Sequence, residues 1–123
     1  LNAENHYVTA YDMYLIFNEA LKYDTVNEII SMTSYDTVYT DKNGNEKTLS
    51  VKNTNQYLAG NVAAPDRVTV IGGKTGTTSA AGNCLILLAR DTSGNPYIAV
   101  ILKSAERGIL YTEMNALLKQ ATS

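Results

Sequence analysis

Apolar residues near the start of the chain recur at spacings of three and four, which places them on one face of a helix. These residues are Ala10, Met13, Tyr14, Phe17, Ala20 and Leu21. Thr9 stands before the segment and Asp12 lies three residues further on, which is the Ser/Thr-x-x-acid form of a helix start. The pattern therefore predicts a helix capped by Thr9. A second such box, from Thr25 to Glu28, predicts a short helix through Ile30.

The pattern then changes to one typical of strands. Residues 35–40 and 46–52 are rich in Tyr, Thr and Val, and the segment Asp41-Lys42-Asn43-Gly44-Asn45 separates them. Asn43-Gly44 favours the positive φ angles of a tight hairpin turn, so the two segments are predicted to form a β-hairpin. Residues 53–55 and 60–66 are predicted as loops. In the second of these, Pro65 is not expected inside a strand.

The second half of the chain predicts three further strands, over residues 67–76, 83–90 and 97–103. The last two are apolar at successive rather than alternate positions, so both of their faces should be covered. The short turn over residues 91–96 makes them antiparallel neighbours. Ser104 is predicted to cap a final helix with one apolar face. The members of that face are Leu110, Met114, Leu117, Leu118 and Ala121.

These elements predict an α+β fold, in which an antiparallel sheet of about three core strands and a small hairpin pack against helices. The 123 residues are enough for one domain and too few for two ordinary ones. An apolar content of 45% and a charged content of 18% are ordinary for a globular protein, so extensive disorder is not expected.

Composition also argues against several classes of function. The 10 basic and 12 acidic residues are intermixed, with no Lys/Arg run that could follow a phosphate backbone, so nucleic-acid binding has little support. A single cysteine, Cys84, and a single histidine, His6, lie too far apart in sequence to suggest a metal site, and no cofactor is expected. Cys84 lies in an apolar run and is predicted to be a buried, unreactive thiol.

Residues 71–82 hold the informative pattern, because several glycines and hydroxyl groups surround one lysine, Lys74. Glycine weakens a strand and is usually found where a backbone or a ligand comes close. Lys74 can offer its charge to a carboxylate, and Thr75 can donate a hydrogen bond to the same group. The alternative is a solvated edge strand that Lys74 protects against aggregation. A phosphate-binding loop is not supported, because its upstream glycine would fall at Arg67 or Val68 and a strand should follow.

The chain resembles the serine-type D-alanyl-D-alanine carboxypeptidases, which are low-molecular-weight penicillin-binding proteins related to the class A β-lactamases. The resemblance rests on four segments in family order and covers nearly the whole chain. They are His6 to Asp12, Asn53-Thr54-Asn55, Gly72 to Thr78 and Ser79 to Leu85. It implies that residues 1–123 form a single, partial domain, the C-terminal half of a catalytic domain with a β-lactamase/DD-peptidase-like fold.

Carried over residue by residue, the resemblance implies a substrate-binding strand. Lys74 and Thr75 would bind the terminal carboxylate of a peptidoglycan stem peptide ending in D-Ala-D-Ala, or the carboxylate of a β-lactam. Lys74 would also act in catalysis, by extending the network that moves protons at the nucleophile. Gly76 would let the substrate lie along the strand like an added strand. The backbone N–H of Thr77 would form half of an oxyanion hole.

The chain contains no Ser-x-x-Lys box, which supplies the acylated serine in this family. Ser93-Gly94-Asn95 matches the family's Ser-x-Asn box in letters only, because it follows the Lys-Thr-Gly segment instead of preceding it, and it is predicted to be a turn. Both boxes are expected upstream of Leu1. The parent protein is thus expected to be a serine D-Ala-D-Ala carboxypeptidase outside the cytoplasmic membrane, and this chain alone is expected to be inactive.

Two alternatives remain open, a β-lactamase and a non-catalytic peptidoglycan-binding module. A β-lactamase would share residues 74–76, whereas the binding module would lack Ser-x-x-Lys in its parent protein as well. In the family, the strand that matches residues 97–103 pairs with strands from the N-terminal end of the domain. Without them its apolar edge predicts association with a complementary N-terminal segment or with a second copy of the chain.

Overall fold

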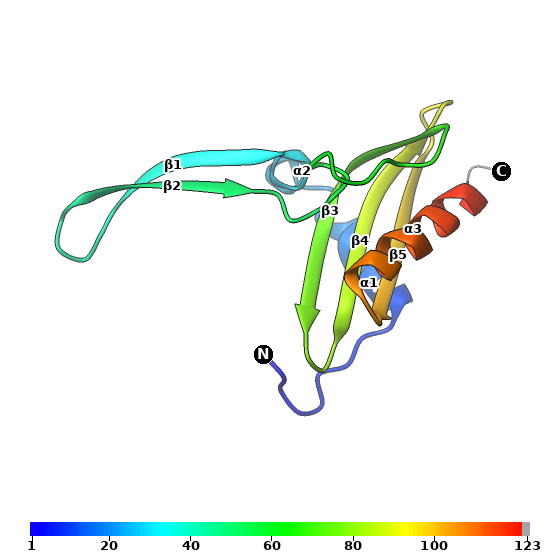
Figure 1. Cartoon of the computed structure of the whole chain (residues 1–123), viewed down its shortest axis with the longest axis horizontal. Coiled ribbons are helices and arrows are strands. Elements are labelled where there is room, and N and C mark those ends of the chain that lie inside the picture. Colours follow the sequence, from blue (N-terminus) through cyan, green and yellow to red (C-terminus); the bar gives the residue numbers. More distant parts are fainter. Residues whose placement is uncertain (122–123) are drawn as a thin grey trace.

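The computed structural model of the protein describes residues 1–121, which form a three-stranded sheet, a projecting hairpin and three helices (Figure 1). The helices are α1 (Ala10–Ala20), α2 (Asp24–Ser31) and α3 (Arg107–Ala121). The strands are β1 (Ser34–Thr40), β2 (Glu46–Lys52), β3 (Val68–Thr78), β4 (Gly82–Asp91) and β5 (Pro96–Ser104). This arrangement confirms the predicted α+β class. Within residues 1–121, no helix is long and apolar enough to span a membrane.

The core sheet has the strand order β3-β4-β5, and both pairs of neighbours are antiparallel. Among the described residues β3 and β5 each pair with β4 alone, so each has one unpaired edge. In β3 the register shifts between Val70 and Gly72, an irregularity of the β-bulge kind. The free edge of β5 agrees with the expectation from sequence, while association through that edge stays a prediction.

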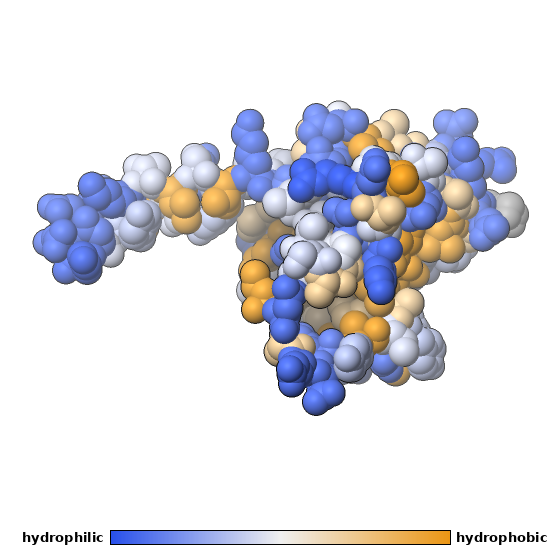
Figure 2. All heavy atoms as spheres, turned by 60° about the horizontal axis from the view of Figure 1, so that its bottom comes forward, coloured by the Kyte–Doolittle hydropathy of each residue, from blue (hydrophilic) through white to orange (hydrophobic). Residues whose placement is uncertain are grey.

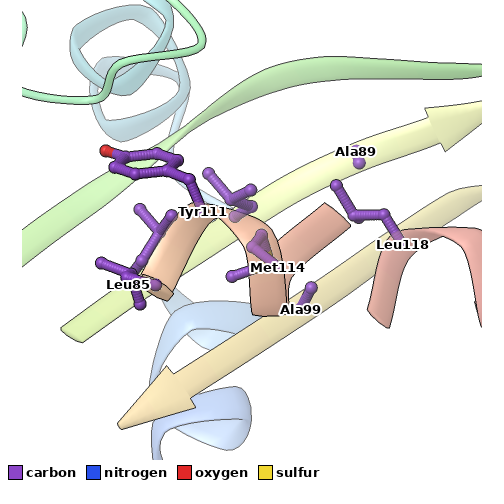
Figure 3. Close-up of a cluster of buried hydrophobic side chains, with 8 residues drawn as sticks. Leu85, Ala89, Ala99, Tyr111, Met114 and Leu118 are labelled. Carbon is purple, nitrogen blue, oxygen red and sulfur yellow. The ribbon is translucent and has the colours of Figure 1, made fainter. Parts of the chain in front are cut away.

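Strand β4 is covered on both faces, because Leu85, Ile86 and Leu87 are buried in succession. Helix α3 covers one face of β4 and β5, and a cluster of buried side chains fills the interface (Figure 3). The cluster consists of Leu85, Leu87, Ala89, Ala99, Leu110, Tyr111, Met114 and Leu118. On the opposite face α1 packs against β5 and α2 against β3 (Figure 1). The predicted burial of two faces is confirmed for β4, whereas β5 is only half-buried at most positions.

The start of α1 was predicted correctly from its local sequence. The hydroxyl oxygen of Thr9 accepts a hydrogen bond from the backbone N–H of Asp12 at 3.0 Å, and the Asp12 carboxylate accepts one from the backbone N–H of Thr9 at 2.9 Å. This is a complete capping box. Phe17 is buried and Met13 is half-buried, but Tyr14 of the predicted apolar face remains 37% exposed.

The hairpin of β1 and β2 extends away from the sheet (Figure 1). In its turn Gly44 alone has a positive φ angle, 83°, although Asn43 was expected to share that conformation. The side chain of Asp41 fixes the turn instead, because its Oδ1 accepts hydrogen bonds from the backbone N–H groups of Asn45 and Asn43. The same two hydrogen bonds lower the pKa of Asp41. Figure 2 shows a hydrophilic hairpin tip and apolar side chains nearer the body.

Three predicted boundaries were wrong. Helix α2 begins at Asp24 after Tyr23, without a side-chain cap, so Thr25 does not cap it. Asn27 explains the earlier start, because its amide donates hydrogen bonds to the carbonyl oxygens of Leu21 and Tyr23 and holds the connection between the helices. Arg67 has a φ angle of 69° and lies before β3. Ser104 pairs in the ladder with β4 and ends β5, so it does not cap α3.

Two predictions about burial also need correction. On α3 Tyr111 is buried, whereas Leu117 and Ala121 are exposed. Positions 110, 111, 114 and 118 form the buried stripe, which leaves Leu117 at its margin. Cys84 is half-buried rather than buried, and its Sγ lies 3.5 Å from the carbonyl oxygen of Ala81.

Gly72 and Gly73 allow β3 to approach its neighbours closely. A Cβ atom on Gly72 would lie 2.6 Å from the carbonyl oxygen of Ile30 in α2, and a Cβ atom on Gly73 would collide with the carbonyl oxygen of Ile86 in β4. Both glycines are therefore required for packing within this chain. Gly76 differs, because a Cβ atom there would meet no atom within 4 Å.

We expect Gly73→Ala to lower the free energy of unfolding of the chain by about 1–3 kcal/mol, the usual cost of overpacking. The matched control, Gly76→Ala in the same strand, should change it by less than about 0.5 kcal/mol, because the new methyl group meets no atom. Equilibrium urea denaturation followed by circular dichroism measures both values. Equal losses in the two variants would contradict the packing role of Gly73.

Candidate active site

The predicted site residues, 74–77, lie in the C-terminal part of β3. Since β3 pairs only with β4 among the described residues, their backbone has a free edge. Side chains alternate between the two faces of a strand. Lys74 and Gly76 belong to the face that α2 covers, while Thr75 and Thr77 belong to the face that α3 covers. A ligand along the free edge could therefore be contacted from both faces of the sheet.

Lys74 is exposed, and its Nζ donates a hydrogen bond to the backbone carbonyl oxygen of Thr75 at 2.6 Å. The ammonium group thus lies along its own strand. Within residues 1–121 Lys74 forms no ion pair with an acidic side chain. Its charge is available to an anion that approaches the edge of β3.

Thr75 is half-buried, and its Oγ1 lies 2.5 Å from the Oγ1 of Thr54. Thr54 belongs to the loop that follows β2, and it reaches β3 across a separation of 21 residues. The sequence showed residues 53–55 only as a loop that resembles the family. Nothing in the local pattern indicated that Thr54 would contact a predicted site residue.

Thr77 lies at the exposed end of β3, where its hydroxyl group donates a hydrogen bond to Oδ1 of Asn83 in β4 at 3.4 Å. The amide of Asn83 in turn donates to the carbonyl oxygens of Ser104 and Ala105, each at 3.3 Å. The end of β3 is thereby tied to the end of β5. Asn83 is a second contributor that local sequence patterns did not indicate.

The loop that carries Thr54 is attached to the body of the protein on both sides. The side-chain amide of Asn53 donates a hydrogen bond to the carbonyl oxygen of Met32 at 2.6 Å. Further along, the backbone N–H of Gln56 donates to the hydroxyl oxygen of Tyr111 in α3 at 3.0 Å. These bonds fix the loop relative to both α2 and α3.

Tyr57 continues this attachment. Its hydroxyl group donates to Oδ1 of Asn115 at 2.7 Å, and its ring packs edge-on against Tyr111, with ring centroids 5.3 Å apart. Burial, with a smaller contribution from neighbouring Tyr111, raises the pKa of Tyr57 to about 12. The protonated phenol is therefore the form that the fold requires.

Residues 74–77 line neither of two grooves found in residues 1–121. The larger groove, of about 510 Å³, lies between α2 and the base of the hairpin and is lined in part by Ile29, Tyr35 and Val51. A smaller groove of about 410 Å³ separates the loop after residue 55 from α3. The predicted site is therefore an open strand edge, and additional residues would be needed on its open side to enclose a ligand.

The structure supports the interpretation of Ser93-Gly94-Asn95 as a turn. This segment connects β4 to β5, and Gly94 has a positive φ angle of 84°. It lies near the start of β3, because Asp91 pairs with Val68, so the whole length of the strand separates it from the end at Thr78. In residues 1–121 no group of three or more His, Cys, Asp or Glu side chains could hold a metal ion.

The fold is similar to part of a DD-transpeptidase. One mutant of the Streptomyces K15 DD-transpeptidase matches with a TM-score of 0.81 and 25% identity over 96% of this chain, and another with 0.79 and 25% over 93%. An evolved penicillin-binding protein homologue from Mycobacterium tuberculosis matches with a TM-score of 0.65 and 19% identity over 94%, a likeness of fold alone. The chain covers 43%, 42% and 41% of these three structures, less than half of each.

Sequence comparison gives the family. The model of the D-alanyl-D-alanine carboxypeptidases, peptidase family S11, matches residues 1–106, and the chain therefore belongs to this family. A search of curated proteins gave no match. The resemblance inferred from the motifs is confirmed, while the roles of Lys74, Thr75, Gly76 and Thr77 stay predictions.

The raised pKa of Tyr57 predicts a loss of stability at high pH. In the unfolded chain a tyrosine ionises near pH 10, whereas folded Tyr57 keeps its proton up to about pH 12. Its contribution to stability is therefore complete below pH 10 and is lost as the pH rises from 10 to 12. Urea denaturation gives the free energy of unfolding at pH 9 and at pH 11. The decrease in this free energy between the two pH values should be smaller for Tyr57→Phe than for the wild type. Tyr39→Phe, on the exposed hairpin, is the control and should keep the wild-type difference.

Proposed function

We propose that this chain is the substrate-binding part of a serine DD-peptidase that removes the terminal D-Ala from peptidoglycan stem peptides. The observation that carries the proposal is the open edge of β3. Lys74 has no acidic partner there, Thr75 presents a hydroxyl group, and a Cβ atom at Gly76 would meet no atom within 4 Å. Membership of the carboxypeptidase family supports the substrate class.

Four residues of β3 have substrate-facing roles in this proposal. Lys74 and Thr75 bind the terminal carboxylate, since an ammonium group and a hydroxyl group are both donors to an anion. The substrate backbone lies along the free edge beside Gly76, as an added strand. The backbone N–H of Thr77 donates to the oxygen of the attacked carbonyl group, where negative charge develops.

The nucleophile of the proposed reaction comes from outside this chain, which contains no Ser-x-x-Lys box. The serine oxygen attacks the carbonyl carbon of the penultimate D-Ala, and its proton goes to the base. The bond to the terminal D-Ala breaks, and the departing amine takes up a proton. Water then hydrolyses the acyl-serine ester and regenerates the serine. We also propose a location outside the cytoplasmic membrane, because peptidoglycan lies there.

The proposed DD-peptidase activity is to be measured in the full-length gene product. Release of D-Ala from a D-Ala-D-Ala peptide supports a carboxypeptidase. Transfer of the acyl group to an added amine would instead indicate a transpeptidase, the activity named for the Streptomyces K15 relatives. Rapid turnover of a penicillin adduct would indicate a β-lactamase. Absence of any adduct would overturn the proposed function.

We expect the chain of residues 1–123 alone to form no covalent adduct with penicillin, because it has no acylatable Ser-x-x-Lys. Intact-mass spectrometry after incubation with penicillin is the measurement. A stoichiometric increase in mass at any serine of this chain would contradict the proposal that the nucleophile lies elsewhere.

In the full-length gene product, Lys74→Ala should slow acylation by penicillin about 10- to 150-fold, since a hydrogen bond to a charged group contributes roughly 1.5–3 kcal/mol. The fold should remain, because the Lys74 side chain is exposed. Lys47→Ala, at an exposed position of the hairpin, is the matched control and should acylate at the wild-type rate. An unchanged rate in Lys74→Ala would mean that Lys74 only protects an edge strand.

A further inference from the structure

We infer that Thr54 positions Thr75 for recognition of the substrate carboxylate, by donating its hydroxyl proton to the Oγ1 of Thr75. The inference rests on the proposed function, in which Thr75 binds that carboxylate. Thr54 lies outside residues 74–77, and it acts through Thr75 rather than on the substrate. It is therefore a positioning residue and not a catalytic one.

The direction of the hydrogen bond follows from the chemistry of the two groups. The two Oγ1 atoms lie 2.5 Å apart, and either hydroxyl group could be the donor. Each hydroxyl has one proton to donate and two lone pairs to accept. An ionised carboxylate only accepts, so Thr75 must use its single proton on the ligand. Thr75 then has no proton left for Thr54, and Thr54 must be the donor.

The resulting series of hydrogen bonds runs from the Thr54 hydroxyl group to the Thr75 hydroxyl group and on to the carboxylate. In such a series each hydrogen bond polarises the next, so Thr75 becomes a stronger donor than an isolated threonine. The contact also restricts the rotation of the Thr75 side chain before a ligand arrives, which lowers the entropy that binding must remove. Both effects depend on the hydroxyl group of residue 54 and not on the size of its side chain.

The structure holds Thr54 in place from both sides, while its own side chain remains exposed. Asn53 is tied to Met32, and its Oδ1 accepts a hydrogen bond from the backbone N–H of Asn55 at 2.9 Å. Asn55 itself is completely buried. The carbonyl oxygen of Thr54 accepts a hydrogen bond from the side chain of Gln56 at 3.0 Å. The position of Thr54 thus does not depend on its hydroxyl group, which is free to serve Thr75.

The test uses the full-length gene product and compares acylation by benzylpenicillin with acylation by its methyl ester, which lacks the anionic carboxylate. We expect Thr54→Val to lower the ratio of the acylation rate constant for benzylpenicillin to that for the methyl ester about tenfold, the equivalent of about 1.4 kcal/mol. Thr54→Ser keeps the hydroxyl group and should restore the ratio to within about twofold. Thr69→Val, the same change at an exposed site near the start of β3, is the matched control and should keep the wild-type ratio. The ratio does not depend on the fraction of folded protein.

A second comparison uses the Thr75→Val background. There Thr54→Val should have no further effect on the ratio, since Thr54 acts only through the hydroxyl group of Thr75. An unchanged ratio in Thr54→Val, which includes an equal loss of rate with both ligands, would overturn the positioning role of Thr54. If penicillin still acylates the wild type in that case, the proposed function remains intact. A wild type that penicillin does not acylate would overturn both.

Discussion

The pairing of β3 with β4 is the constraint on which the candidate site depends. Residues 74–77 are polar or glycine, so their own side chains contribute little apolar burial to fix them. The ladder from Val68 to Thr78 holds them instead, and β4 is a firm support because it is buried on both faces. Gly73 permits this pairing, since a side chain there would collide with the backbone of β4. The site is thus an extension of the core by backbone hydrogen bonds.

A strand edge has a chemical advantage over a site on one face of a sheet. Lys74 and Thr75 are adjacent in sequence but belong to opposite faces, so an anion at the edge can contact both. The ammonium charge acts over distance and tolerates some displacement, whereas a hydroxyl hydrogen bond weakens steeply with angle. The group that depends on direction is the one that a second residue, Thr54, holds in place. The group that depends on charge has no such restraint beyond its bond to a backbone carbonyl.

Sequence signals predicted this fold best where the interactions are local. The Thr9 box and the hairpin around Gly44 involve residues within a few positions of one another, and the structure has both. The box at Thr25 and the cap at Ser104 failed because other interactions overrode the local preference. Asn27 holds the start of α2 through the preceding turn, and the ladder with β4 extends β5 through Ser104.

The candidate site shows the same division. Residues 74–77 could be found because their types are unusual for a strand, and the family pattern gave them roles. Thr54 and Asn83 could not be found as partners, because their contacts with Thr75 and Thr77 exist only once β2, β3 and β4 are in place. Exposed polar side chains have no periodicity that marks them. Their meaning comes from the residue they meet, which only the tertiary structure specifies.

The described structure leaves apolar surface uncovered on the side of the sheet where Lys74 lies. On α1, Tyr11 is 67% exposed, Ile16 is 59% exposed and Leu15 is 47% exposed. Burying one large apolar side chain contributes roughly 1.5–3 kcal/mol, so a segment that covered this helix would stabilise the fold. Helix α1 contacts β5, however, at the opposite edge of the sheet from β3 and Lys74. A segment that covered α1 would therefore stabilise the fold from the side of β5, whereas the serine that the proposed function requires must reach the edge of β3.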